Sequence, residues 1–353
     1  MSHNSFGKNF TVTSFGESHG ENIGVIIDGC PSNVFIDREG IQFELNRRKP
    51  GQSKITTSRK ETDEFQITSG IFNGKTTGAP ICIVIPNQNA NSKDYDHLSE
   101  VYRPSHADFT YEKKYGNRDF KGGGRSSARV TAGWVAAGAI AKQLLKSLCE
   151  IEIVGYVSQI YTVECNKSPD YSIDNIESSM VRCPAPKESQ LMIEAIIKAK
   201  KEGDSLGGIV STIIRNCPVG VGDPVFHKLN AQLAHAMFSI NAVKGFQIGS
   251  GFDSIIKKGS ELNDEWVSTA NGPQTKTNNS GGIQGGISNG MPILFDVAFK
   301  PTATISKKQH TIDKSNNAIE LEAYGRHDPC VVPRAVPIVE AMTALVLVDN
   351  LLP

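Results

Sequence analysis

Residues 131–148 constrain the fold most, because the first part of this segment is rich in alanine and glycine and the last part contains leucines. A helix made of such small residues is thin, so it can pack closely against sheets on either side. Five apolar runs rich in β-branched residues have the length and composition of strands, several of them buried. These runs span residues 23–27, 81–85, 151–157, 209–214 and 293–297.

Helical segments alternate with these strands. Asp37 is placed to cap a helix that ends at Arg48, ahead of a Pro-Gly turn. Further helices are expected at residues 188–201, 227–238 and 335–351, and polar, turn-rich loops at 87–99 and 261–282. We expect the glycine- and asparagine-rich stretch 278–282 to be mobile. Alternating strands and helices without a clear linker predict one α+β domain over residues 1–353.

The bulk composition describes a globular protein and excludes several classes. The 353 residues carry a net charge of zero and contain no apolar stretch long enough to span a bilayer, so neither global nucleic-acid binding nor a membrane protein is expected. Seven cysteines without a Cys-x-x-Cys pair, and a start without a signal pattern, favour reduced thiols in the cytoplasm and no metal site.

The basic residues are nevertheless concentrated. Seven of the twelve arginines lie between positions 47 and 129, where they alternate with glycine, serine and threonine. Two solvated basic surfaces would be the ordinary interpretation of such runs. Their proximity in sequence to histidine-containing polar motifs favours a site for a small polyanion instead.

Three histidines lie in dense polar motifs. The motifs are Gly16-Glu17-Ser18-His19-Gly20, Arg103-Pro104-Ser105-His106-Ala107-Asp108 and Gly325-Arg326-His327-Asp328-Pro329. Imidazole transfers protons well near neutral pH. A single histidine of this kind is more often structural, but three such motifs in one chain favour catalysis.

A glycine run, Gly122-Gly123-Gly124-Arg125-Ser126-Ser127-Ala128-Arg129, precedes the alanine-rich helix. It lacks the Gly-Lys-Ser/Thr of a Walker loop and the dinucleotide-binding fingerprint. Arginines, two hydroxyls and a helix N-terminus could hold a phosphate there, although a flexible loop with a capping serine remains the alternative. Taken alone, the stretches 241–242, 281–286 and 300–304 are equally well explained as turns.

These motifs resemble those of the chorismate synthase family, from about Gly7 to the C-terminus. The resemblance implies a single domain in which helices lie between two antiparallel sheets, and usually a homotetramer. The implied reaction is the 1,4-anti elimination of phosphate from 5-enolpyruvylshikimate 3-phosphate to give chorismate, in the shikimate pathway of aromatic amino-acid biosynthesis. Reduced FMN is required, without net redox change.

The resemblance also implies roles for individual residues. His19 and His106 would act as acids, and Asp328 would relay a proton from the flavin. FMN would contact Arg125, Ser126, Ser127, Asn241, Ala242, Gly285, Lys300, Pro301, Thr302, Ala303, Thr304 and Arg326. Arg48, Arg103 and Arg129 would hold the anions of the substrate or of NADP.

Two positions depart from the family pattern. Trp134 stands where a basic residue is usual, and Lys54 replaces an arginine of some relatives, which keeps the charge but loses the bidentate fork. Some members reduce flavin with NADPH; because no dinucleotide-binding fingerprint is present, we expect an external flavin reductase here. The alternatives are another lyase or phosphotransferase for anionic substrates and a catalytically silent flavin- or nucleotide-binding protein. Nucleic-acid binding is disfavoured because few aromatic residues accompany the basic runs.

Overall fold

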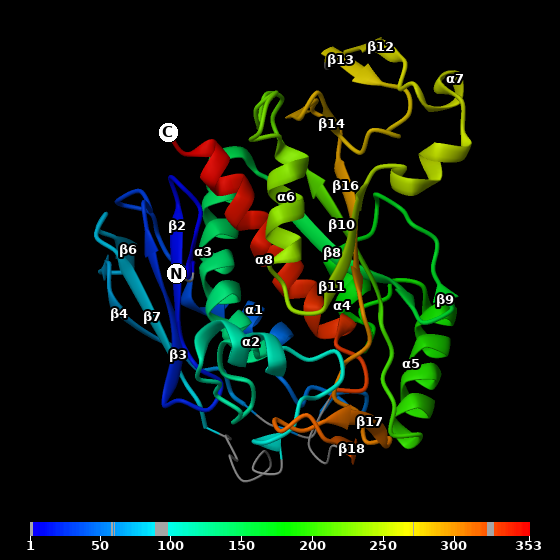
Figure 1. Ribbon diagram of the computed structural model, residues 1–353. Helices are drawn as coiled ribbons and strands as arrows, with labels where there is room; N and C mark the ends of the chain where they lie inside the picture. The colour runs from blue at the N-terminus through cyan, green and yellow to red at the C-terminus, as the bar shows by residue number, and fades with distance from the viewer. Residues whose placement is uncertain (1–2, 58, 60, 89–97, 271, 323–327) are drawn as a thin grey trace.

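Two five-stranded antiparallel sheets face each other across a layer of helices in the computed structural model (Figure 1), which describes residues 3–57, 59, 61–88, 98–270, 272–322 and 328–353. The first sheet has the order β1-β2-β3-β7-β4 and the second the order β11-β16-β10-β8-β9. The first consists of β1 (Ser5–Phe6), β2 (Thr11–Gly16), β3 (Asn22–Asp28), β7 (Ile81–Pro86) and β4 (Gln66–Ser69). The second consists of β11 (Val243–Ile248), β16 (Ile293–Phe299), β10 (Gly208–Arg215), β8 (Glu152–Ile160) and β9 (Val163–Glu164). The expected α+β sandwich is confirmed, and all five predicted apolar runs are strands.

Two long helices, α3 (Thr131–Cys149) and α8 (Val332–Leu351), fill the space between the sheets. Gly133 of α3 lies against β3, where an added Cβ would be 2.9 Å from the carbonyl oxygen of Gly24. Gly138 lies against α8, where an added Cβ would be 2.3 Å from the Cβ of Ala341. The small residues therefore permit close packing, as predicted. Helix α3 contacts β2, β3 and β7 of the first sheet and β8 of the second, so it meets both sheets as expected, although α8 provides most of the helical contact with the second sheet.

The remaining helices surround this core. Asp37 caps α1 (Arg38–Arg48) by accepting a hydrogen bond of 2.9 Å from the backbone N–H of Glu39, as predicted. The amphipathic α5 (Pro186–Lys201) packs beside β8 and β9, and α6 (Leu229–Phe238) packs on α8 and β11. Shorter helices are α2 (Asp108–Tyr115), α4 (Ile173–Glu177) and α7 (Gly259–Leu262), with 3-10 turns η2 (Gly124–Ser126), η3 (Ala128–Val130) and η4 (Gly251–Ile256).

Small hairpins extend from the two sheets. They are β5 (Ile71–Phe72) with β6 (Lys75–Thr76), β12 (Trp266–Thr269) with β13 (Gly272–Thr275), β14 (Ile283–Gln284) with β15 (Ile287–Ser288), and β17 (Gln309–Ile312) with β18 (Ala318–Leu321). The β12–β13 hairpin lies within the stretch expected as a loop, so that expectation is wrong in part. Asp264 accepts backbone hydrogen bonds from Asn279 and Ser280 at 2.7 and 2.8 Å, which tie down the stretch 278–282. Most of the other expected loop, 89–97, lies outside the described residues.

The two ends of the chain meet at the last turn of α8. Asp349 Oδ1 accepts hydrogen bonds from the backbone N–H groups of Lys8, Asn9 and Phe10 at 2.7, 2.6 and 2.8 Å. The side chain of Asn9 donates in return to the carbonyl oxygen of Leu352 at 3.0 Å. Among the described residues, no helix has both the length and the apolar character needed to cross a membrane.

Candidate active site

His19 and His106 each lie against one glycine of the run that precedes α3. A Cβ added to Gly122 would be 2.5 Å from His19 Nε2, and one added to Gly123 would be 3.5 Å from His106 Cε1. Both glycines have a positive φ, 71° and 82°. The fully buried Ser18 donates its hydroxyl hydrogen to the carbonyl oxygen of Gly122 at 3.2 Å. The missing side chains therefore let both imidazoles approach one short piece of backbone.

His106 is placed by a tight turn. Ser105 adopts φ 57°, an uncommon conformation for a residue other than glycine, and His106 N donates to the carbonyl oxygen of Arg103 at 3.2 Å. Lys300, the first residue after β16, donates its Nζ hydrogen to the carbonyl oxygen of Ser105 at 2.8 Å. Long-range contact therefore brings two of the predicted segments, 103–108 and 300–304, together.

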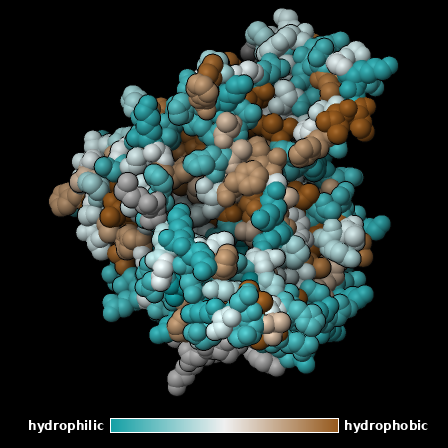
Figure 2. Space-filling view, viewed as in Figure 1, coloured by the Kyte–Doolittle hydropathy of each residue, from teal (hydrophilic) through white to brown (hydrophobic). Residues whose placement is uncertain are grey.

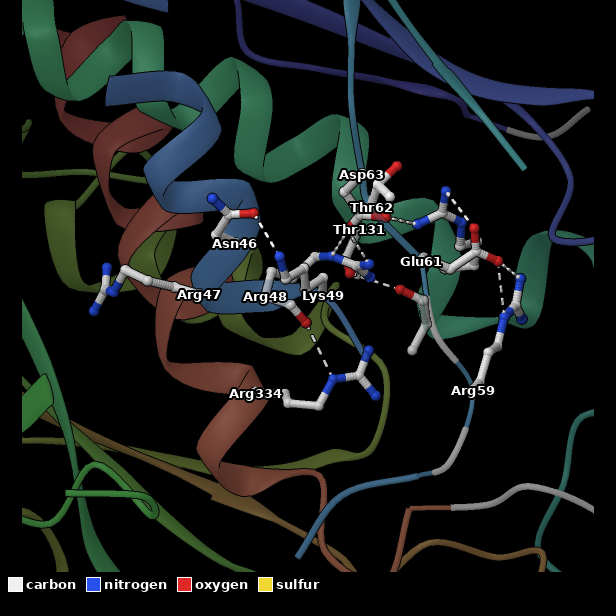
Figure 3. Close-up of polar contacts among 12 residues, drawn as sticks. Asn46, Arg47, Arg48, Lys49, Arg59, Glu61, Thr62, Asp63, Thr131 and Arg334 are labelled. Carbon is white, nitrogen blue, oxygen red and sulfur yellow. Dashed lines mark hydrogen bonds and ion pairs between the residues drawn. The ribbon is translucent and has the colours of Figure 1, made fainter. Parts of the chain in front are cut away.

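Arg48 and Arg129 share one buried carboxylate, that of Asp63. Figure 3 shows Arg48 beside Asp63. Arg48 donates from Nη2 and Nε to Asp63 Oδ2 at 2.5 and 3.1 Å, and Arg129 Nη1 donates to Oδ1. Arg129 Nε also donates to Asn87 Oδ1 at 2.8 Å. The two predicted anion-binding arginines are thus adjacent, although one lies at the end of α1 and the other in η3.

Asp328 forms a second ion pair beside this cluster. Its Oδ2 accepts from Arg334 Nη1, and its Oδ1 accepts from the backbone N–H of Thr57 at 2.9 Å. Arg334 Nε donates to the carbonyl oxygen of Arg48 at 3.1 Å (Figure 3). The Thr302 hydroxyl donates to the carbonyl oxygen of Asp328 at 3.0 Å. The candidate base Asp328 is therefore fixed next to Arg48.

Positive charge is in excess at this place, with four guanidiniums, those of Arg48, Arg59, Arg129 and Arg334, for the three carboxylates of Glu61, Asp63 and Asp328. Burial alone would raise the pKa of Asp63, but Arg48 and Arg129 hold it below its usual value. Burial lowers the pKa of Arg129, and the neighbouring Arg48 lowers it further. A bound anion would relieve this excess, so the cluster is suited to a polyanionic ligand.

A small, mainly apolar pocket lies beside the guanidiniums. Arg48 and Arg334 form one part of its wall, and Asn241, Ala242 and Phe299 form another. Asn241 Nδ2 donates to the carbonyl oxygen of Ser126 at 2.8 Å, whereas its Oδ1 is buried without a hydrogen-bond partner among the described residues. An unpaired buried acceptor of this kind is suited to an N–H group of a flat ligand.

The predicted phosphate cradle in the glycine run is bonded within the chain. Arg125 donates to the carbonyl oxygens of Gly16 and Ser14, both at 3.0 Å, and the Ser126 hydroxyl donates to that of Gly123 at 2.7 Å. Ser127 Oγ accepts from the N–H of Arg129 at 3.3 Å. The run therefore shapes the wall between the histidines, and its use as a phosphate cradle stays a prediction.

Some predicted site residues are not brought into this cluster. Gly285 lies in the β14–β15 hairpin, next to Gly286, whose carbonyl oxygen bonds the N–H of Leu229 at the start of α6. Asn241 follows the other end of that ten-residue helix, about 15 Å away along its axis. Pro301, Ala303 and the buried Thr304 follow Lys300 in the chain. Arg326 and His327 lie outside the described residues.

The two departures from the family pattern lie away from the ion pairs. Trp134 is partly buried against the apolar core, and the side chain of Lys54 is exposed. The sequence interpretation missed Arg334 and Asp63. Arg334 follows Asp328 by six residues and could have been noticed from that spacing, whereas nothing local distinguishes Asp63 from other loop acids. The described part of the chain contains no group of three or more histidine, cysteine, aspartate or glutamate side chains able to hold a metal ion.

Comparison with known proteins gives one consistent result. The sequence model of the chorismate synthase family matches residues 10–352. Curated chorismate synthases from Prochlorococcus marinus (strain NATL2A) and Christiangramia forsetii are 55% and 56% identical over 350 and 352 residues, which cover 99% of this chain and 97% of each relative. A crystal structure of a chorismate synthase superposes with a TM-score of 0.78 at 31% identity, covering 98% of this chain and 93% of that one.

Proposed function

Because the chain belongs to the chorismate synthase family, we propose that it eliminates phosphate from 5-enolpyruvylshikimate 3-phosphate in the 1,4-anti sense and releases chorismate. One observation carries the proposal: two imidazoles lie against Gly122 and Gly123, next to a region with more guanidiniums than carboxylates. The substrate has two carboxylates and a phosphate. Such an anion needs fixed positive charge for binding and a proton donor for its leaving group.

In this proposal the arginines hold the substrate. Arg48, Arg129 and Arg334 already lie together, so binding requires exchange of internal carboxylate contacts for contacts with the ligand. Arg103 would contribute a further guanidinium next to His106. Since a buried guanidinium is strongly attracted to a second anion, preformed charge of this kind orients the substrate with little reorganisation.

The histidines would act as general acids. His19 and His106 face the same glycine pair, so one can protonate the leaving phosphate while the other holds a proton on the cofactor. Asp328 would receive the proton removed from the substrate ring. Its carboxylate is held from two sides by Arg334 and the Thr57 N–H, which keeps its orientation fixed.

Reduced FMN is the proposed cofactor, and the pocket residues fit such a group. Phe299 and Ala242 give the pocket apolar walls, and the unpaired Asn241 Oδ1 offers an acceptor to a ring N–H. Lys300 donates its backbone N–H to the carbonyl oxygen of the pocket residue Ala242, and Arg125 precedes Ser126, which bonds the pocket residue Asn241. Both are candidates for the phosphate of the cofactor. When bound, reduced FMN would supply the electron-rich ring that assists removal of phosphate and proton without net oxidation.

An anaerobic assay tests the proposal. We expect dithionite-reduced FMN and 5-enolpyruvylshikimate 3-phosphate to yield chorismate over many turnovers per flavin. His19→Ala and His106→Ala should each lose about 10²–10⁴-fold in turnover while remaining folded. His235→Ala is the matched control. The His235 ring stacks on Phe6, away from the site, with the ring centroids 5.7 Å apart, so this variant should retain turnover. Oxidation of one flavin per product, or a phosphotransfer product, would contradict the proposal.

The supply of flavin and the location of the enzyme complete the proposal. All seven cysteines are free thiols, which fits the reducing cytoplasm. We expect an external reductase to supply reduced FMN, so the purified protein alone should not oxidise NADPH in the presence of FMN. Measurable NADPH oxidation by the purified chain would assign that step to this protein.

We also propose a homotetramer. Exposed apolar side chains gather on η4, where Phe252, Ile255 and Ile256 are 72%, 80% and 85% exposed. Figure 2 shows apolar surface over this part of the molecule. Contiguous exposed apolar residues of this kind are typical of contact surfaces between proteins. Light scattering after size-exclusion chromatography should give four times the mass of 38.2 kDa, and Ile256→Glu should reduce it.

A further inference from the structure

Asp108, the first residue of α2, is buried at the centre of a group of donors. Its Oδ2 accepts from Arg103 N at 3.0 Å and from Arg103 Nε at 2.8 Å. Its Oδ1 accepts from Arg103 Nη2 at 2.8 Å and lies 3.0 Å from Arg118 Nη1. The same oxygen is 3.0 Å from His106 Nδ1. One carboxylate therefore touches both the candidate acid and two buried arginines.

His106 Nδ1 has two neighbours of opposite character. Asp108 Oδ1 can only accept a hydrogen bond, whereas Arg103 Nη2, at 2.9 Å, can only donate one. A single ring nitrogen cannot satisfy both at once, so the two contacts belong to two states of the ring. With a proton on Nδ1, in the imidazolium or in one neutral tautomer, the ring donates to Asp108; without that proton, Nδ1 accepts from Arg103. The ring keeps one orientation in both, with its Cε1–Nε2 edge against Gly123.

The surrounding charges act on this ring in opposite directions. Burial lowers the pKa of His106, the hydrogen bond from His106 to Asp108 raises it, and the charges of Arg103 and Lys300 lower it; the net direction is down. Lys300 faces the ring from the end of β16, with Lys244 close to it, and Arg118 acts through Asp108. Burial alone would raise the pKa of Asp108, but its bonds to Arg103 and His106 hold it far below the usual value, so the carboxylate stays ionised.

Asp108 also ties this ring to the chain on either side. Arg118 donates to the carbonyl oxygens of Leu98 and Ser99 at 3.0 and 2.7 Å, and it lies only four residues before Gly122. The carboxylate that holds His106 therefore also holds the segment leading into the glycine run. This connection explains why a surface-forming helix such as α2 begins with a buried acid.

We propose that Asp108 is a positioning residue that acts through His106, holding Nδ1 so that Nε2 faces the glycine run with a proton to deliver. Its kinetic consequence rests on the elimination proposed above, whereas the contact between the two side chains does not. The prediction for the ring itself can therefore be tested without any activity.

The test is a titration of His106 by nuclear magnetic resonance in protein labelled with ¹⁵N-histidine, with the signal assigned by its loss in His106→Gln. Asp108→Asn should lower the pKa of His106 by about one pH unit or more, because an adjacent anion is lost. Arg103→Gln should raise it. Glu112→Gln is the matched control. Glu112 lies on the same helix, 3.7 Å from Arg118, but its carboxylate does not touch His106. This variant should therefore leave the His106 titration unchanged.

The pH dependence of turnover separates positioning from general structural support. A one-unit fall in the pKa should reduce kcat at neutral pH about tenfold, with recovery toward acid pH and an unchanged KM. A purely structural role would lower kcat at every pH. If the wild-type chain does not form chorismate, the elimination is wrong, and the titration still decides the role of Asp108.

Two outcomes would overturn the inference. One is an unchanged His106 titration in folded Asp108→Asn protein. The other, which holds even if that variant does not fold, is a His106 pKa that does not rise in Arg103→Gln, because the ring would then not respond to the charges that meet at Asp108. Opposite shifts of the His106 pKa in the two variants support the inference.

Discussion

Gly122→Ala should disable His19 while lowering the unfolding free energy by only about 1–2 kcal/mol. The added Cβ would lie 2.5 Å from His19 Nε2 and 2.6 Å from Ser18 Oγ, so the imidazole must move by about 1 Å to reach ordinary contact distance. A displacement of that size at a reacting group costs about 10²-fold in rate, or about 2.7 kcal/mol of barrier. Alanine at φ 71° adds about 1–2 kcal/mol of backbone strain, which reduces stability.

Gly116→Ala separates these two effects. Gly116 ends α2 at φ 68°, nearly the same backbone conformation, but a Cβ there meets nothing within 4 Å. Both variants should lose about 1–2 kcal/mol of unfolding free energy, and only Gly122→Ala should lose the further hundredfold in anaerobic turnover. Thermal melting and turnover are measured on the same preparations. Turnover of Gly122→Ala within threefold of Gly116→Ala would refute the placement of His19 against this glycine.

Two further predictions concern the helical layer. Gly138→Ala should lower the unfolding free energy by about 1–3 kcal/mol in urea denaturation, because the added Cβ would lie 2.3 Å from the Cβ of Ala341. Gly259→Ala is the control and should not lower it in this way, because a Cβ there meets nothing within 4 Å. Adding Ala341→Gly to Gly138→Ala should restore part of the lost stability. Burial alone would raise the pKa of Glu340, but Arg47 and Lys142 lower it from 4.5 to about 2. The ionised carboxylate therefore contributes fully to the unfolding free energy above pH 4.5, and this contribution is lost as the pH falls toward 2. Glu340→Gln should be less stable at neutral pH and show a flatter acid dependence in the same measurement, and an unchanged acid dependence would argue against this carboxylate.

Local patterns predicted the elements that bury apolar side chains. The five apolar runs form β3, β7, β8, β10 and β16. They could be predicted because a short continuous run rich in β-branched residues is typical of a buried strand. Strand β2 was not predicted, although it pairs with β3 in the first sheet: its sequence Thr-Val-Thr-Ser-Phe-Gly is half polar, and its outward residues are only partly buried. The hairpin β12–β13 was missed because its strands have only four residues each and are mostly exposed, so their sequences show no alternation of apolar and polar side chains.

The candidate site could be predicted only as separate motifs. Charged residues in sequence motifs indicated Arg48, Arg129 and His106, but not that Arg48 and Arg129 share Asp63. That carboxylate belongs to the connection between α1 and β4, and only the folded chain places it between the two guanidiniums. The glycine run was expected to bind phosphate because glycines and arginines occur together there. In the structure Arg125 donates to carbonyl oxygens of β2, partners that no local pattern shows, and phosphate binding by the run stays a prediction.

The bond between Asp349 and the backbone of residues 8–10 has a consequence for synthesis on the ribosome. The partners are up to 341 positions apart, so at about 5–20 residues per second the first segment waits roughly 20–70 s for its acceptor. During that interval α8 is also missing from the inner face of the second sheet. The nascent chain should therefore expose apolar surface until α8 has emerged from the ribosome. Chains stalled before α8 emerges should be cleaved quickly by added protease, and full-length released chains should be protected. Equal resistance to the protease in both would show that the rest of the chain folds without α8.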